Sequence, residues 1–360
     1  MERREATAAA AGPQRLPLSR CIVQEDPFNA ETPLAALAGP LVPTGICFVR
    51  SHFDVPALDG GAYRLLVTGA VSRELQLSLD DLRRLPSREL VVTMECAGNG
   101  RTLMRPPPPG VPWGLGAVST VRFEGTALAH VLEMAGLDTD AMEVLFVGAD
   151  RGQVQPGRWE PFARSLPVPH ALHPDTLLAW GMNGAPLPPE HGFPLRLVVP
   201  RWYGMASVKW LVEIRALRAP FDGYFQAEQY RYVDDATGDA RPVSLIRVRA
   251  LIASPADGET VPLGPVEVRG MAWSGHGPIE RVEVSADGGS TWQAAELGQP
   301  LSPYSATPWR VLWRPDRPGT YTLVARATDA AGNVQPLEPV WNRLGYGNNC
   351  AQRVCVVVQG

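Results

Sequence analysis

Apolar side chains recur at helical spacing in two segments of the first half of the chain. In Thr126–Ala135 the apolar positions lie three and four residues apart and Gly136 follows, which predicts a helix that ends at this glycine. A shorter helix is expected over Ser78–Leu85, because Ser78 and Asp81 have the spacing of a reciprocal capping box. Short elements also fit a chain that carries 36 Pro and 35 Gly residues.

Continuous apolar runs bounded by turn residues predict buried strands in the same part of the chain. The runs are Val144–Val147 and Leu195–Val199, and Tyr63–Thr68 and Leu90–Thr93 are also predicted to be strands. Because strands and helices do not alternate regularly between about Tyr63 and Ala216, the expected fold class is α+β and not a doubly wound sheet.

Beyond Ser244 the pattern changes to short segments in which apolar and polar residues alternate. Val266–Arg269 and Val282–Val284 are examples, and turn residues such as Asp287–Ser290 and Asp329–Asn333 separate such segments. This pattern is typical of an immunoglobulin-like β-sandwich.

The length of 360 residues and this change of pattern predict two domains. Residues 1–40 are expected to form a flexible N-terminal lead, residues 41–242 the first domain and residues 243–360 the second. The linker between the domains is expected near Thr237–Val243.

Charge and composition exclude several classes of function. The net charge is −4 without a basic run, so no nucleic-acid or anionic-membrane partner is expected. No stretch of about 18 apolar residues occurs, and the alanine run near the N-terminus is too short for a signal peptide, so a cytoplasmic location is expected. Five cysteines without a Cys-x-x-Cys pair resemble neither a disulfide framework nor a zinc site.

The most unusual local sequence is Met94–Arg101, which follows the predicted strand Leu90–Thr93. Small residues after Cys96 would let a bulky ligand approach the backbone, and Arg101 would favour a thiolate. A lone cysteine is more often a buried core residue. A third alternative makes Cys96 a metal-free nucleophile with His52 or His191 as its base.

Five segments in order along the chain resemble those of the sulfite oxidase family of molybdopterin-dependent oxidoreductases. They are Phe48–His52, Met94–Arg101, Trp113–Ser119, His191–Arg196 and Ala206–Trp210. In the second half, Ser285–Trp292 and Asn333–Pro336 resemble the family's immunoglobulin-like dimerisation domain. The resemblance implies a mixed α/β molybdopterin-binding catalytic domain followed by a β-sandwich dimerisation domain, and a homodimer.

The cofactor implied by the resemblance is molybdenum-pyranopterin, with Cys96 as the metal ligand. A thiolate is a soft ligand suited to a metal that cycles between oxidation states. The other cysteines, Cys21, Cys47, Cys350 and Cys355, are expected to be structural. No Cys-x-x-Cys-His segment occurs, so no haem is expected in this chain.

A pterin phosphate needs charge-assisted donors, for which Arg196 and Lys209 are suitable, while Asp150 could accept from pterin amino groups. The full set of cofactor-binding candidates that the resemblance implies is Phe48, Arg50, His52, Cys96, Asp150, His191, Arg196, Ser207 and Lys209.

The resemblance implies oxidation of sulfite to sulfate by oxygen-atom transfer, with electrons passed to an external acceptor such as a cytochrome c. Arg50, Cys96, Arg101 and Tyr230 are the catalytic candidates, because an oxyanion needs fixed donors beside the metal. Tyr230 could equally be a packed tyrosine, since Tyr224 and Tyr232 lie close by in the sequence.

One segment departs from the family pattern. The family often has Trp-Asn-Leu-Arg-Gly in the second domain, whereas this chain has the order Arg343 then Leu344. If the register is kept, Leu344 faces the site and Arg343 points elsewhere, which would weaken sulfite binding or admit another substrate. The remaining alternatives are a related nitrate or sulfoxide reductase and a non-catalytic binding module.

Overall fold

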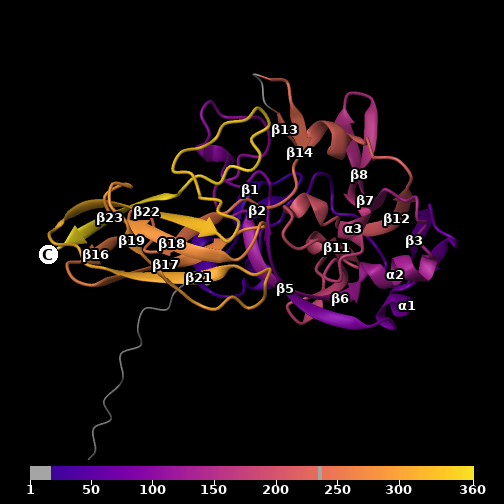
Figure 1. The fold of residues 1–360 in the computed structure, drawn as a ribbon, viewed down its shortest axis with the longest axis horizontal. Coiled ribbons are helices and arrows are strands. Elements are labelled where there is room, and N and C mark those ends of the chain that lie inside the picture. The colour runs from indigo at the N-terminus through magenta and orange to yellow at the C-terminus, as the bar shows by residue number, and fades with distance from the viewer. Residues whose placement is uncertain (1–17, 234–236) are drawn as a thin grey trace, which may run out of the picture.

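The computed structural model describes residues 18–233 and 237–360. Figure 1 shows an α+β part, coloured indigo to salmon, beside a β-sandwich coloured orange to yellow. The expected α+β fold with a C-terminal sandwich is confirmed. No helix in the described part of the chain is long and apolar enough to cross a membrane.

The first part contains two five-stranded sheets. One is antiparallel and has the order β10-β9-β6-β5, with β11 also paired to β9. Its strands are β5 (Ser87–Glu95), β6 (Val118–Ala127), β9 (Leu177–Met182), β10 (Ala185–Pro186) and β11 (Arg196–Val198). Every residue of β9 is buried, which explains why the sequence of this strand is apolar throughout.

The other sheet is mixed and has the order β4-β3-β12-β7-β8, in which β12 and β3 run parallel. Its strands are β3 (Leu65–Gly69), β4 (Leu75–Leu77), β7 (Glu143–Gln155), β8 (Arg158–Pro167) and β12 (Leu211–Leu217). Three α-helices accompany the sheets: α1 (Leu79–Arg83), α2 (Leu128–Ala135) and α3 (Val168–Ala171).

The two predicted helices are present, with corrections at their ends. Ser78 caps α1 through the expected capping box with Asp81. Gly136 ends α2 in the left-handed conformation, with φ of 67°. The helix α2 begins two residues later than predicted, because Thr126 and Ala127 still pair with β9 as the end of β6.

The second part is a β-sandwich of two sheets, ordered β15-β17-β21-β20 and β16-β23-β22-β18-β19. Its strands are β15 (Arg249–Ser254), β16 (Thr260–Pro262), β17 (Val266–Trp273), β18 (Ile279–Ser285), β19 (Gln293–Ala294), β20 (Glu296–Leu297), β21 (Thr307–Trp313), β22 (Gly319–Asp329) and β23 (Arg353–Gln359). Alternate residues of β21, including Trp309 and Val311, point into the core, as period-2 patterning requires. The predicted turn Asp287–Ser290 lies between the antiparallel strands β18 and β19.

The prediction of a flexible lead over residues 1–40 is wrong for residues 18–40, whereas residues 1–17 lie outside the described residues. Residues 18–40 contain β1 (Cys21–Gln24), β2 (Asn29–Glu31) and the 3-10 helix η1 (Leu34–Ala38). Asn29 and Ala30 are fully buried, and Ala30 forms a two-way backbone bridge with Val49. The segment is ordered because its short apolar positions complete the core, a tertiary contact that local composition does not reveal.

The expected linker also contains regular structure. The strand β14 (Ala240–Pro242) pairs with β13 (Arg231–Val233). The remaining elements are 3-10 helices η2 (Thr44–Ile46), η3 (Arg101–Leu103), η4 (Pro189–His191) and η5 (Gly204–Ala206), and the π-helix η6 (Phe225–Gln229).

A buried polar contact joins the two parts of the molecule at the end of β5. The carboxylate of Glu95 lies 3.4 Å from Arg249 Nε, and both side chains are 1% exposed. Trp273 Nε1 and Asn99 Nδ2 each donate to this carboxylate at 2.9 Å. Burial raises the pKa of Glu95 above its ordinary value, and Arg249 opposes this shift.

Candidate functional site

Cys96 directly follows β5, where the strand turns into a tight loop. Its backbone amide donates to Ala117 O at 2.9 Å, and its carbonyl accepts from Asn99 N at 3.0 Å. The loop is held from the other side by the sandwich, since Gly347 N donates to Ala97 O at 2.7 Å. The position of the Cys96 thiol is therefore fixed by both parts of the molecule.

Burial raises the pKa of the Cys96 thiol, and the nearby Arg50 is the first of the groups that oppose the shift. The residue is only 7% exposed. A buried thiol of this kind stays protonated near neutral pH unless a soft metal ion replaces its proton.

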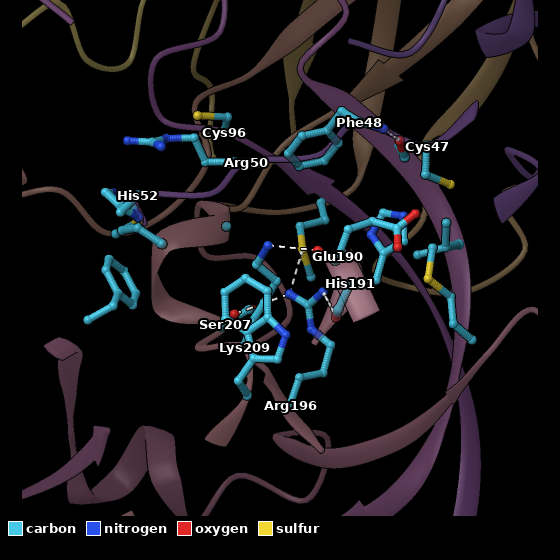
Figure 2. Close-up of a pocket in the computed structure, with 18 of the residues that line it drawn as sticks. Cys47, Phe48, Arg50, His52, Cys96, Glu190, His191, Arg196, Ser207 and Lys209 are labelled. Atoms are coloured by element: carbon cyan, nitrogen blue, oxygen red, sulfur yellow. Dashed lines mark hydrogen bonds between the residues drawn. The ribbon is translucent and has the colours of Figure 1, made fainter. Parts of the chain in front are cut away.

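Cys96 lies on the wall of a cavity that we call the deep cavity. Its lining comprises Cys47, Phe48, Arg50, His52, Met94, Cys96, Ala97, Ser119, Val121, Phe123, Asp150, Phe162, Met182, Glu190, His191, Arg196, Gly204, Met205, Ser207, Lys209, Trp210 and Tyr230. Figure 2 shows Arg196, Ser207 and Lys209 on one side of this cavity, opposite Cys96 and Arg50. The structure thus brings together every predicted cofactor-binding residue.

Arg196 is held in place by backbone carbonyls. Its Nη1 donates to His191 O at 3.0 Å, and its Nη2 donates to Ser207 O at 3.1 Å. Burial lowers its pKa to about 9. Nη2 also donates to Met94 Sδ at 3.3 Å, so the proton left to meet an anion is on Nη1.

Lys209 lies beside Arg196 at the same end of the cavity. Its Nζ donates to Glu190 O at 2.7 Å and to Ser51 Oγ at 3.3 Å, and lies 4.1 Å from the centre of the Trp210 ring. Burial, followed by the charge of Arg196, lowers the pKa of Lys209 to about 7. An anion bound here would restore the ammonium form, because an opposite charge favours it.

Asp150 has an unused acceptor. Its Oδ1 is buried and has no hydrogen-bond partner among the described residues. Burial raises the pKa of Asp150 to about 7, although Lys209 and Arg50 oppose the shift. A buried carboxylate oxygen without a donor is costly, so this atom is suited to a ligand that supplies N–H groups.

The half-buried His52 contacts the buried Tyr230. His52 Nε2 lies 2.7 Å from the Tyr230 hydroxyl, and the imidazole stacks on Phe162 with ring centres 4.5 Å apart. Burial, followed by the charge of Arg50, lowers the pKa of His52 well below its usual range. The imidazole is therefore neutral, and one of its nitrogens is engaged by the hydroxyl.

Two residues of this region were missed from sequence. Arg20 Nη2 lies 3.1 Å from Glu190 Oε1 and 3.2 Å from His191 Nε2. Glu190 lines the deep cavity, and the pKa of His191 is lowered mainly by burial. Arg20 was not considered because it lies in the predicted flexible lead, and no local sequence pattern indicates its contacts.

The hydroxyl of Ser207 is engaged by the protein. Val199 N donates to Ser207 Oγ at 3.0 Å, so the hydroxyl proton is the group left to meet a ligand. Cys47 lines the same cavity, and its thiol lies 3.4 Å from Pro43 O as a weak donor. Burial raises the pKa of Cys47 to about 12.

A second cavity, which we call the arginine cavity, lies on the other side of Cys96. Its lining comprises Arg50, Cys96, Arg101, Pro109, Gly110, Val111, Trp113, Gln229, Tyr230, Leu344 and Tyr346. Arg50, Cys96 and Tyr230 line both cavities. All four predicted catalytic residues therefore line the arginine cavity, and three of them also line the deep cavity.

Arg101 is nearly buried and has a fixed orientation. Its Nη1 donates to Val111 O at 2.7 Å, and its Nη2 donates to Leu344 O at 3.3 Å. Its guanidinium carbon lies 5.2 Å from the centre of the Tyr346 ring. Three glycines make room for it, because a Cβ at Gly98, Gly110 or Gly345 would lie within about 3 Å of its side chain.

The residues Leu344 and Tyr346 come from the second part of the molecule. Leu344 lines the arginine cavity, whereas Arg343 is exposed and does not line it. The placement expected from the exchanged order of these two residues is therefore observed, whereas its effect on sulfite binding stays a prediction. Tyr346, which was missed from sequence, stacks on Tyr230 with ring centres 4.9 Å apart. Of the neighbouring tyrosines, neither Tyr224 nor Tyr232 lines either cavity.

Within residues 18–233 and 237–360, no group of three or more His, Cys, Asp and Glu side chains could hold a metal ion.

Comparison with protein families finds two matches along the chain. A model described as the oxidoreductase molybdopterin binding domain matches residues 52–225. A model described as the Mo-co oxidoreductase dimerisation domain matches residues 241–359. The two matches correspond to the α+β part and the sandwich.

Curated relatives extend over nearly the whole chain. Mitochondrial sulfite oxidase of Rattus norvegicus is 39% identical over 96% of this chain, which spans 67% of that protein. Sulfite oxidase of Arabidopsis thaliana is 35% identical, and the alignment covers 92% of this chain and 92% of that protein. Among solved structures, the sulfane dehydrogenase SoxCD from Paracoccus pantotrophus has a TM-score of 0.82 at 29% identity, over 98% of this chain and 93% of that chain.

Proposed function

Because the chain belongs to the sulfite oxidase family of molybdopterin-dependent oxidoreductases, we propose that it oxidises sulfite to sulfate at a molybdenum ligated by Cys96. The observation that carries the proposal is the position of Cys96 on the wall shared by the deep cavity and the arginine cavity. One cavity offers donors for a cofactor, and the other offers arginines for an oxyanion.

The residues of the deep cavity fit molybdenum-pyranopterin, the cofactor of this family. Arg196 and Lys209 would bind its phosphate, with the Ser207 hydroxyl as a further donor. Asp150 Oδ1 would accept from amino groups of the pterin, which would satisfy an oxygen that lacks a donor. Phe48, His52 and His191 would complete the walls.

When bound, the cofactor supplies two-electron oxygen-atom transfer chemistry. The chain's own part is to bind and orient the substrate anion with Arg50 and Arg101, whose guanidinium groups are already fixed by neighbouring oxygens. Tyr230, whose hydroxyl is held by the neutral His52, would help to orient the anion.

Electrons would leave to an external acceptor such as a cytochrome c. The match of residues 241–359 to a dimerisation domain supports a homodimer formed through the sandwich.

A metal-free nucleophilic cysteine is less well supported. Its base would have to bond the thiol. The hydrogen bonds of the described residues include none between Cys96 and a histidine, and His52 is engaged with Tyr230.

The test is Cys96→Ser, because a serine oxygen is a harder and poorer ligand for this metal site. We expect the variant to fold, to lose sulfite-dependent ferricyanide reduction and to contain less molybdenum per chain by elemental mass spectrometry. Cys350→Ser is the matched control, since Cys350 is also buried but lines neither cavity. Full activity in Cys96→Ser would refute the ligand assignment, and wild-type protein that holds molybdenum without oxidising sulfite would refute the substrate and point to reduction.

A further inference from the structure

The arginine cavity is larger than a sulfite ion requires. It encloses about 170 Å³, whereas a water molecule in the liquid takes about 30 Å³ and sulfite has only four heavy atoms. A bound sulfite would therefore leave room for several further heavy atoms.

The lining of the arginine cavity combines two cations with several apolar side chains. Among the described residues that line it, the only cations are Arg50 and Arg101. The carbonyls of Val111 and Leu344 fix the Arg101 guanidinium, so the head of an anion has a defined place beside Cys96.

The remaining lining includes the apolar side chains of Pro109, Val111, Trp113 and Leu344. Gln229, Tyr230 and Tyr346 also line the cavity, but an anion oxygen that faced the four apolar side chains would have no donor there, which costs free energy. A carbon substituent on the sulfur would instead be buried favourably.

We propose that this site also oxidises small alkanesulfinates. The sulfinate head binds Arg50 and Arg101, and the alkyl group packs against Val111 and Leu344. The inference rests on the proposed function, because it uses the same oxygen-transfer site, and it extends the substrate class from an inorganic to an organic sulfur oxyanion.

The reaction balances as R–SO2⁻ plus water giving R–SO3⁻, two protons and two electrons. One sulfur–oxygen bond forms, the sulfur is oxidised by two electrons, and no carbon–sulfur bond breaks. The protons go to solvent, and the electrons reduce two equivalents of a one-electron acceptor, which is ferricyanide in the assay.

The experiment compares sulfite with methane-, ethane- and propanesulfinate as substrates of the molybdenum-loaded enzyme. Each additional methylene should raise kcat/KM about fourfold, because it is transferred from water to a contact with the apolar side chains of the cavity. Mass spectrometry should find one sulfonate for every two ferricyanide ions reduced, with the new oxygen derived from labelled water.

The variant Leu344→Arg tests whether the alkyl group of the substrate packs against the apolar side chains of the cavity. We expect it to lower the ratio of kcat/KM for propanesulfinate to kcat/KM for sulfite at least tenfold, because a cation replaces an apolar contact that only the alkyl group uses. Leu312→Arg is the matched control, since Leu312 is 49% exposed on β21 and does not line the cavity. Calorimetric binding of propanesulfonate, a redox-inert product, should weaken in Leu344→Arg but not in the control, and this readout does not depend on turnover.

The outcomes separate the two proposals. Turnover of sulfite without sulfinates, or sulfinate rates that neither rise with chain length nor respond to Leu344→Arg, would overturn the inference and leave the proposed function standing. Turnover of sulfinates without sulfite would support the inference and refute sulfite as the substrate. Turnover of neither by enzyme with a full complement of molybdenum would refute both.

Discussion

Replacement of Arg249 by leucine should destabilise the protein strongly, because it leaves the Glu95 carboxylate buried without its cation. Both side chains are 1% exposed and lie 3.4 Å apart. Removing one partner of such a pair costs about 3–5 kcal/mol. With a urea dependence of about 3 kcal/mol per molar, the unfolding midpoint of the metal-free protein should fall by about 1 M.

The double variant Glu95→Gln with Arg249→Leu separates charge from packing. A neutral amide can still bond Asn99 or Trp273, so this variant should recover about 2 kcal/mol of the loss. Arg310→Leu is the matched control, because its pair with Glu296 is 60% and 68% exposed and should contribute less than about 1 kcal/mol.

The single variant Arg249→Leu should also make the thiol of Cys96 more accessible to reagents. Gly347 N and Asn348 Nδ2 of the second part donate to the carbonyls of Ala97 and Gly100. These carbonyls belong to the loop that Asn99 ties to Glu95. Iodoacetamide should therefore alkylate Cys96 faster in metal-free Arg249→Leu than in wild type. The reasoning fails if Arg249→Leu is no less stable than Arg310→Leu. It also fails if the double variant loses as much free energy of unfolding as the single variants Glu95→Gln and Arg249→Leu lose together.

Three further variants test the site. Arg50→Ala should raise the KM for sulfite at least tenfold with molybdenum content nearly unchanged, and an unaltered KM would remove Arg50 from the substrate site. Arg20→Ala should increase the loss of molybdenum during gel filtration, because Glu190 and His191 lose their partner, whereas equal retention would make Arg20 dispensable. Folded Lys209 loses its proton near pH 7 but the unfolded chain keeps it to about 10.5, so the stability of the metal-free protein should rise between these pH values. Urea unfolding should show that Lys209→Met flattens this rise, and an unchanged slope would contradict the lowered pKa.

Features that depend on a few consecutive residues could be predicted from the sequence. The Ser78 capping box and the end of α2 at Gly136 depend on spacing within one turn. The place of Leu344 on the cavity wall was anticipated by comparing the order of two adjacent residues with the family pattern. The grouping of the deep-cavity residues was anticipated only because several segments of the chain resembled one family together.

Other features depend on partners that are distant in the chain. Arg20 lies 170 residues from Glu190 in the sequence, and its role was hidden by an alanine-rich segment that suggested a flexible lead. Glu95 and Arg249 could not be paired in advance, because each looks like an ordinary surface charge until the sandwich covers the end of β5. Tyr346 likewise reaches Tyr230 only through the packing of the second part against the first.

The arginine cavity takes one wall from the segment that contains Leu344 and Tyr346, and neither residue lines the deep cavity. Changes in this one segment can therefore alter which molecule is accepted without touching a side chain that would hold the cofactor. A library confined to these positions would be a compact starting point for directed evolution, since its members would differ in substrate range while sharing one route to metal loading.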